Sequence, residues 1–243
     1  MQLSNYHSHC TFCDGRSIPE DFVRFAITHG FRAYGFSSHS PLPFETFWNM
    51  SKDDMPEYLQ EIKRLKQKYS DQLEIYAGLE IDYLDETYNA SIPYFQELPL
   101  DYRIGSIHFL PVSERLAEEN MVCIDGSFRE YAHSVERHFE GDVRLLVKRF
   151  FDTTIEACLD LVQEKELMVE VNTKNWTKKK ELYPRVEYLS RMRKMNIPVM
   201  VNSDCHYPDL VNDGRKEVFE LLKQAGFKST RELVKGKWQD IAL

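Results

Sequence analysis

The chain of 243 residues is 42% hydrophobic and 29% charged, with a formal net charge of −8, a composition typical of a globular protein with a sizeable core. The acidic balance disfavours nucleic acid as a partner, and no stretch approaches the roughly 20 apolar residues of a membrane span. The start of the chain shows no secretion signal and the five cysteines indicate no disulfide framework, so we expect a cytoplasmic protein.

Short apolar runs that predict strands alternate with longer stretches that have the apolar spacing of helices. In chain order, strands are predicted at Leu3–Tyr6, Ala33–Ser38, Leu73–Leu79, Asp101–Ile107, Leu167–Val171 and Ile197–Ser203. Helices are predicted at Pro19–His29, Asp53–Tyr69, Ser91–Leu98, Asp142–Lys165, Leu182–Met195 and Asp209–Ala225. This alternation is typical of a parallel α/β fold. Because no repeat or linker marks a boundary, we expect a single domain over residues 1–243.

Three further segments interrupt this alternation. Pro41–Lys52 is rich in proline and aromatic residues and predicts a loop. Phe109–Ser127 predicts a loop or a small hairpin with Met121–Ile124 as its second arm. We expect the final segment, Gly226–Leu243, to be a tail that packs on the outside of a barrel.

Side chains that bind metal ions follow the predicted strands where each strand ends. They include five of the eight histidines, and are His7, His9, His39, Glu80, His108, Asn172, Asp204 and His206. In a barrel of parallel strands these ends share the face on which barrel enzymes carry their chemistry. The pair His7 and His9 alone would be weak evidence, but its convergence with the others predicts a metal cluster. Such a mixed nitrogen and oxygen set suits Zn, Mn or Fe better than Ca or Mg.

Several nearby polar residues have two interpretations each. Asp14 is either a turn residue before Gly15 or a further metal ligand. Asp82, two residues after Glu80, is expected to support a ligand or cap a helix rather than to bind metal. The cations Arg16 and Lys174, with Asn172, are either exposed surface residues or substrate ligands, since a phosphate needs such donors.

The remaining cysteines and histidines are expected to be structural. Cys10 and Cys13 have a spacing used by zinc and redox sites, but no second pair completes such a site. Cys205 is expected to pack in the core. His29 lies at a helix end, where a cation suits the helix dipole. The histidines of a polar helical stretch, His133 and His138, are expected on a solvated face.

The motifs ending in His39, Glu80, His108 and His206, together with His7-x-His9, resemble the PHP superfamily (polymerase and histidinol phosphatase), and the chain length resembles its monofunctional histidinol-phosphate phosphatases. The quoted motifs are Ser-Ser-His39, Gly-Leu-Glu80, Gly-Ser-Ile-His108 and Asn-Ser-Asp204-x-His206. The resemblance implies a distorted seven-stranded (βα) barrel that binds up to three divalent ions. It also implies hydrolysis of a small phosphate ester, L-histidinol phosphate, by water that a metal acidifies.

The same resemblance implies a distribution of the ligands over three metal sites. The first site takes His7, His9, Glu80 and Asp204; the second takes Glu80 and His108; the third takes His39, His206 and Asp14. Asp204 and His206 are the candidates to protonate the leaving alkoxide.

The chain departs from the family pattern in one place. A fifth strand ending in Gly-His-x-Asp is absent, and no room for it exists between Asp142–Lys165 and Leu167. We therefore expect a barrel that lacks one βα unit, a weakened second metal site, and His133 or His138 as candidate replacements for the lost ligand.

Three alternatives to a histidinol phosphatase stay open. The first is a PHP phosphoesterase that acts on a nucleotide or sugar phosphate. The second is a metal-binding remnant that no longer turns over, and the third is that the gap lies in the gene sequence rather than in the protein. Amidohydrolase barrels also open with His-x-His, but the early Glu80 and the final Asp204-x-His206 favour the PHP pattern.

Overall fold

The protein is described here from a computed structural model, which describes residues 3–113, 115–124 and 126–243. Its strands are β1 (Leu3–Asn5), β2 (Phe31–Phe36), β3 (Glu74–Ala77), β4 (Glu80–Asp82), β5 (Ile104–Ser106), β6 (Phe109–Pro111), β7 (Met121–Cys123), β8 (Val169–Asn172), β9 (Val199–Asn202), β10 (Ser229–Val234) and β11 (Lys237–Ala242). Its α-helices are α1 (Pro19–Thr28), α2 (Met55–Lys68), α3 (Pro93–Gln96), α4 (Phe128–His138), α5 (Val143–Glu164), α6 (Trp176–Lys179), α7 (Val186–Lys194) and α8 (Arg215–Gln224). None of the described helices has the length and apolar character needed to cross a bilayer.

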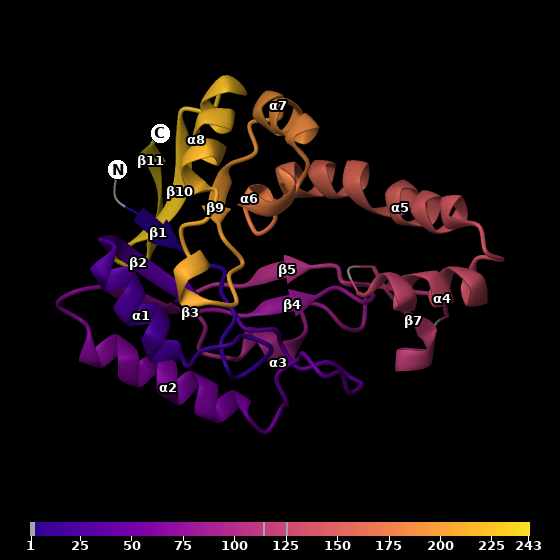
Figure 1. Ribbon diagram of the computed structural model, residues 1–243, viewed down its shortest axis with the longest axis horizontal. Coiled ribbons are helices and arrows are strands. Elements are labelled where there is room, and N and C mark those ends of the chain that lie inside the picture. The colour runs from indigo at the N-terminus through magenta and orange to yellow at the C-terminus, as the bar shows by residue number, and fades with distance from the viewer. Residues whose placement is uncertain (1–2, 114, 125) are drawn as a thin grey trace.

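Parallel strands form the centre of the molecule, as the alternation of elements predicts (Figure 1). Strand β1 pairs with β2 and β2 with β3, while β4 pairs with β5 and β8 with β9, all in parallel. Parallel bridges from Ser8 to Cys205 and from His39 to Glu80 connect these groups at the strand ends. The order is therefore β8, β9, β1, β2, then β3 continued by β4, then β5. Within the described residues no ladder joins β5 to β8.

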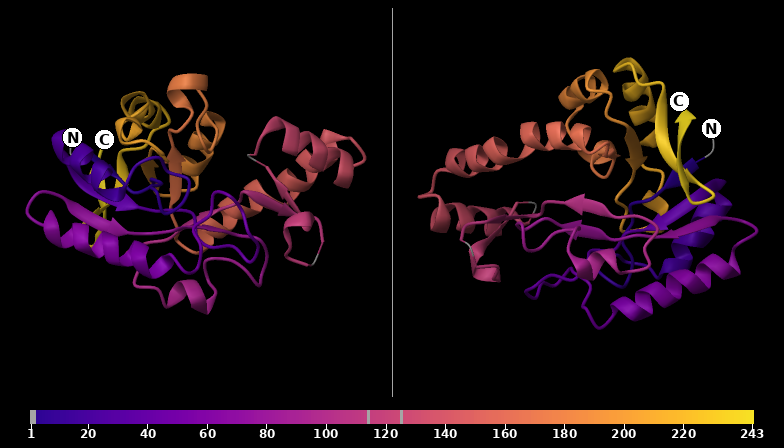
Figure 2. Two further views of the ribbon diagram at one scale, coloured as in Figure 1. Left: turned by 60° about the horizontal axis from the view of Figure 1, so that its bottom comes forward. Right: turned by 180° about the vertical axis from the view of Figure 1, so that it is seen from behind.

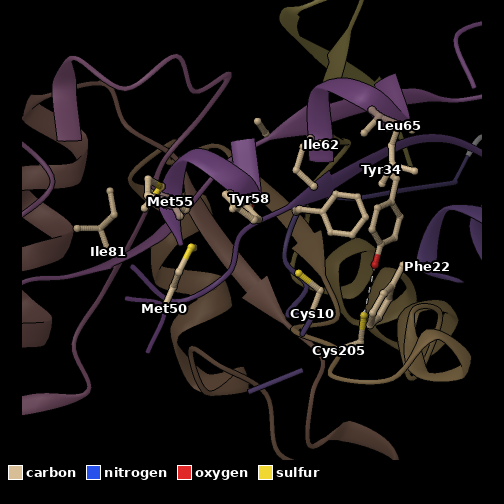
Figure 3. Close-up of a cluster of buried hydrophobic side chains, with 14 of the residues drawn as sticks. Cys10, Phe22, Tyr34, Met50, Met55, Tyr58, Ile62, Leu65, Ile81 and Cys205 are labelled. Atoms are coloured by element: carbon tan, nitrogen blue, oxygen red, sulfur yellow. Dashed lines mark hydrogen bonds between the residues drawn. The ribbon is translucent and has the colours of Figure 1, made fainter. Parts of the chain in front are cut away.

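Helices cover the outer face of these strands. Helix α2 places Met55, Tyr58, Ile62 and Leu65 on one side at helical spacing, and all four are buried in the core that also holds Phe22 of α1 (Figure 3). Helices α7 and α8 cover β8 and β9 through a second apolar cluster. Figure 1 shows the two helix pairs on opposite sides of the strands.

Two predicted helices begin later than the sequence pattern indicates. Helix α7 begins at Val186 instead of Leu182, and Pro184 explains this because proline disfavours helical geometry in the residue before it. The stretch Asp209–Ala225 is divided: a short 3-10 turn at Pro208–Leu210 is separated from α8 by Gly214, whose φ is 65°. A glycine tolerates that left-handed backbone, so the chain turns there before α8 starts.

The inner face of the strands is closed by aromatic side chains. The single hydroxyl proton of Tyr102 is shared between the carbonyl oxygens of Tyr6 (2.6 Å) and Phe36 (2.9 Å). A Cβ at Gly35 or Gly78 would lie 2.4 or 2.3 Å from the Tyr102 side chain, so both positions need glycine. This ring therefore ties the first three strands together from inside.

The C-terminal segment is a hairpin, β10–β11, rather than a tail on the outside. Its Leu233 is 2% exposed and belongs to the inner cluster with Tyr6 and Met200, and Trp238 packs against the same cluster. Leu233 also accepts and donates backbone hydrogen bonds with the Tyr6 hydroxyl at 3.2 and 2.9 Å. The expectation was wrong because the apolar residues of the hairpin complete an inner cluster that distant strands begin.

A second hairpin and two helices project from one end of the long axis (Figures 1 and 2). Strands β6 and β7 pair in antiparallel fashion, which confirms the hairpin predicted for this region. Helix α4 packs on them through Val135 and Phe139, and Ser127 and Glu130 form a capping box at its start. Helix α5 then returns to the parallel strands, where its Leu159 packs in the second apolar cluster, the one beneath α7 and α8.

The C-terminal end of β1 is held in place by the buried side-chain amide of Asn5. Asn5 is 0% exposed, and its Oδ1 accepts hydrogen bonds from the Ser203 backbone N–H (2.9 Å) and from Arg215 Nη2 (3.2 Å). Its Nδ2 donates to the carbonyl of His7 at 2.9 Å. Arg215 is also buried, and burial lowers its pKa to about 10. This amide therefore joins β1 to the end of β9 and to α8.

We expect Asn5→Ala to lower the free energy of unfolding by about 2–4 kcal/mol, because it leaves a buried N–H and a buried guanidinium without their acceptor. Chemical denaturation measures this change. The control is Asn212→Ala, at an exposed position, which is expected to change stability by less than about 0.5 kcal/mol. Equal stability of the two variants would contradict the role given to Asn5.

Candidate metal centre

Histidines and carboxylates from the ends of several strands meet at one face of the strands. Three groups, drawn from the described residues, each have ligand atoms within 4.8 Å of one another. They are His9, Asp14, His39 and His206; His7, His9 and Asp204; and His39, Glu80 and His108. The structure thus brings together all eight residues that the sequence proposes as metal ligands.

Glu80 lies at the middle of this cluster. Its Oε2 is 3.0 Å from His39 Nδ1, 3.2 Å from His7 Nε2 and 3.5 Å from His9 Nε2, while its Oε1 is 3.5 Å from His108 Nε2. A carboxylate with two oxygens facing different imidazoles can bridge two ions. This position agrees with the bridging role that the family resemblance implies.

The structure groups His39 differently from the expected three-site scheme. His39 Nδ1 faces Glu80, while His39 Nε2 is 3.7 Å from Asp14 Oδ1. The imidazole therefore lies between the group containing His108 and the group containing His206. The scheme gave His39 to the second of these groups alone.

Three buried polar atoms of the cluster make no hydrogen bond of good geometry. They are Asp14 Oδ1, His39 Nδ1 and Glu80 Oε2, the last two lying 3.0 Å apart without the alignment of a hydrogen bond. Leaving such atoms unpaired is costly, and cations coordinate both imidazole nitrogen and carboxylate oxygen. The donor set present here therefore fits divalent transition-metal ions.

Charge compensation decides which forms of these groups are present without metal. Burial opposes the charge of Glu80 and Asp204, but the histidines around them, His7 foremost, hold both pKa values well below their usual range. Burial also opposes protonation of His7, yet Glu170, Glu80 and Asp204 raise its pKa well above normal. Burial and the neighbouring His39 lower the pKa of His9 to about 3, so His9 is a neutral imidazole.

Two carboxylates orient imidazoles of the cluster by contacting the Nδ1 atom of each ring. Asp82 Oδ1 accepts hydrogen bonds from the His108 backbone N–H and lies 2.9 Å from His108 Nδ1, in the supporting position expected for it. Glu170 of β8 lies 2.8 Å from His7 Nδ1 and accepts a 2.8 Å hydrogen bond from Asn202. Holding Nδ1–H in this way directs the other ring nitrogen toward a metal.

Glu170 was not among the residues predicted from the sequence to belong to the site. The available signal was a lone acidic residue within the apolar run Leu167–Val171, on a strand that ends at the cluster. A charged group buried in such a run usually has a partner of opposite charge. That partner, His7, is 163 residues away along the chain, and no local pattern indicates it.

The substrate candidates lie at different distances from the cluster. Asn172 donates a hydrogen bond of 3.1 Å to Asp204 Oδ2, and Lys174 Nζ lies 3.1 Å from the same oxygen. Burial disfavours the charge of Lys174, but Asp204 raises its pKa overall. Arg16 is exposed, and its backbone N–H donates to the carbonyl of His206.

The cysteines and His29 have the structural positions expected of them. Cys10 and Cys205 are buried, and the Tyr34 hydroxyl lies 3.6 Å from Cys205 Sγ (Figure 3). Cys13 is partly buried with Sγ 3.5 Å from His9 Nδ1. The His29 ring stacks on Phe25 at the end of α1.

The suggested replacement ligands do not join the cluster. His133 and His138 belong to α4, in the projecting part of the molecule, and neither is a member of the three groups found among the described residues. His133 is exposed, as expected for a solvated face, and His138 is partly buried.

Comparisons with known proteins agree with this arrangement. The model of the PHP domain family matches residues 5–174. A Deinococcus radiodurans protein named "Probable histidinol-phosphatase" is 28% identical over 243 aligned residues, which cover 90% of this chain and 94% of that protein. The histidinol-phosphatase of Bacillus subtilis is 25% identical, covering 85% of this chain and 94% of the relative.

A solved structure shows the same fold. Histidinol phosphate phosphatase from Lactococcus lactis, complexed with zinc, L-histidinol and phosphate, has a TM-score of 0.69 with this chain. The two are 21% identical, and the superposition covers 98% of this chain and 99% of the other.

We expect Glu170→Gln to weaken zinc binding about 10- to 100-fold, because the amide no longer provides the charged partner that orients His7. Competition with a chromophoric chelator measures the affinity, and circular dichroism checks that the variant is folded. Glu187→Gln, at a carboxylate whose side chain is 74% exposed, is the matched control and is expected to bind zinc normally. Unchanged affinity in the Glu170 variant would show that His7 is oriented without it.

Proposed function

The chain belongs to the PHP domain family, and on that premise we propose that it is a metal-dependent phosphomonoesterase that hydrolyses L-histidinol phosphate to L-histidinol and phosphate in histidine biosynthesis. The observation that carries the proposal is the cluster around Glu80, a buried carboxylate within reach of four imidazoles. The names of the relatives from two bacteria, and the ligands of the Lactococcus lactis structure, support the substrate.

The proposed metal ligands are the eight clustered residues, His7, His9, Asp14, His39, Glu80, His108, Asp204 and His206. They would hold up to three ions of Zn, Mn or Fe, and zinc has the support of the Lactococcus lactis complex. Bound metal supplies a Lewis acid for phosphate oxygens and lowers the pKa of water to near neutrality. No serine or cysteine nucleophile is needed.

The residues of the chain have separate proposed roles around the phosphate. Lys174 and Asn172 approach the cluster from the end of β8 and would donate to phosphate oxygens, with Arg16 as a further cation at the rim. Of the two candidates to protonate the leaving alkoxide, Asp204 and His206, we favour His206, because the low pKa of Asp204 keeps that carboxylate ionised. His206 is suited to this by its position, since its side chain is 17% exposed at the edge of the cluster.

The fold that we propose in detail is a single domain over residues 1–243, a distorted (βα) barrel of the PHP type that lacks one βα unit. The absence of a ladder between β5 and β8 among the described residues supports this proposal. Five described cysteines are free thiols, which suits the cytoplasmic location that we propose.

The gap also favours one competing function, a metal-binding protein that no longer turns over substrate. The two proposals differ in catalysis but not in metal binding. A phosphatase acting on a nucleotide or a sugar phosphate would use the same cluster and would differ only in the substrate that it prefers.

A phosphate-release assay with defined metals separates these functions. We expect the highest kcat/KM for L-histidinol phosphate, compared with sugar phosphates and mononucleotides, and loss of activity on chelation with recovery when zinc or manganese is added. Activity that survives chelation would contradict the metal-dependent mechanism. Metal uptake without phosphate release from any ester would instead indicate the inactive remnant.

We expect Lys174→Met to raise KM for the phosphate ester about tenfold, because a charge-assisted contact to a phosphate oxygen is lost. Steady-state kinetics with parallel metal analysis measure the effect, since Lys174 also lies against Asp204. Lys178→Met, at an exposed position in α6, is the control. An unchanged KM together with full metal content would remove Lys174 from the substrate site.

A further inference from the structure

An aromatic side chain borders the metal cluster at His39 and His108. Trp48, in the loop between β2 and α2, has its ring centroid 4.5 Å from that of His39 and 5.4 Å from that of His108, with interplanar angles of 74° and 77°. Lys174 approaches Asp204 from the end of β8. The cluster therefore has a cationic neighbour at Asp204 and an aromatic neighbour at His39 and His108.

Other aromatic rings support Trp48. It stacks on Phe109 at 5.5 Å with an interplanar angle of 11°, and Phe44 meets Phe109 edge to face at 5.4 Å. Phe109 is only 6% exposed, whereas Trp48 and Phe44 stay partly exposed. The rings form a wall in which the buried Phe109 supports an indole that is accessible beside the cluster.

The loop holds this indole in place through the residues that follow it. Asn49 Nδ2 donates to the carbonyl of Ser40 at 2.6 Å, and the Met50 N–H donates to the carbonyl of His39 at 3.2 Å. Met50 itself is 2% exposed and lies in the core close to Met55 (Figure 3). The backbone on both sides of the loop is thus tied to the strand end that carries His39, so the indole needs little ordering when a ligand binds.

We propose that Trp48 is a specificity-determining residue that receives the organic end of the substrate, through stacking and cation–π contact with a flat aromatic or cationic group. This inference rests on the proposed function, because L-histidinol carries both an imidazole and an amine. If the phosphate binds at the cluster with Lys174 as a donor, Trp48 would offer an aromatic surface beside the same cluster for the organic end. An indole face favours such groups over the hydroxyls of a sugar or glycerol ester.

The test compares two esters in the metal-loaded enzyme. We expect Trp48→Leu to lower kcat/KM for L-histidinol phosphate about tenfold, chiefly through KM, and to change that for glycerol 3-phosphate less than about twofold. Calorimetric titration with L-histidinol gives a second readout without turnover and is expected to show a similar loss of affinity. Trp48→Phe, which keeps an aromatic face, is expected to restore most of both.

The control and the contrary outcomes are distinct. Phe47→Leu, at a neighbour that is 91% exposed, is expected to behave as wild type in every assay. An equal loss for both esters, or loss of bound metal in Trp48→Leu, would show that Trp48 only supports His39 and His108 and would overturn the inference. A wild-type enzyme that prefers another ester would instead overturn the proposed substrate, and the ranking of aromatic and cationic esters in the variant would still test Trp48.

Discussion

The structure depends on how a buried negative charge is compensated at Glu80. This side chain is buried in a position that takes its carboxylate out of water, which is costly unless opposite charge is close by. Without metal, the compensation comes from the imidazoles, above all from His7, whose pKa is raised well above normal. Metal ions can replace that proton, because they bind the deprotonated form of the same nitrogen. Proton and metal ion therefore compete for the same imidazole nitrogen of His7, and for this reason acid pH weakens metal binding.

The spacing of the cluster follows from the parallel register of the strands. Histidines 7 and 9 follow β1, and β1 lies between β2 and the end of β9, so side chains from three segments distant in sequence reach one point. Asn5 holds the C-terminal end of β1 against Arg215 and against Ser203, the residue that precedes Asp204. A shift of β1 by one residue would turn its histidines to the other face, because side chains alternate along a strand. The buried amide of Asn5 thus supports the geometry of the metal centre.

Much of this could be predicted from the sequence, and the misses have a common physical cause. Metal-binding side chains that follow strand ends are local patterns. These patterns, together with Asp14 in a turn, identified the clustered residues. Glu170 was missed because its meaning depends on His7, a contact between distant parts of the chain. The predicted placement of the C-terminal segment was wrong for the same reason, since Leu233 completes a cluster that Tyr6 and Met200 begin. His133 and His138 have the residue type of ligands, but the fold places α4 in a projecting hairpin region.

The proposed loss of a βα unit would affect the cluster less than the sequence alone indicates. In the proposed fold the lost strand would stand between β5 and β8, and the group that contains a residue following β5 is His39, Glu80 and His108. Three protein ligands with one open position is the arrangement of catalytic zinc sites, whereas four protein ligands close a site as in structural zinc. The other two groups take their ligands from the ends of β1, β2 and β9 and from the Asp14 turn, none of which borders the gap. If an ion is held by His39, Glu80 and His108 alone, it would therefore keep a position for water or phosphate, and Glu80 would still lie between the groups.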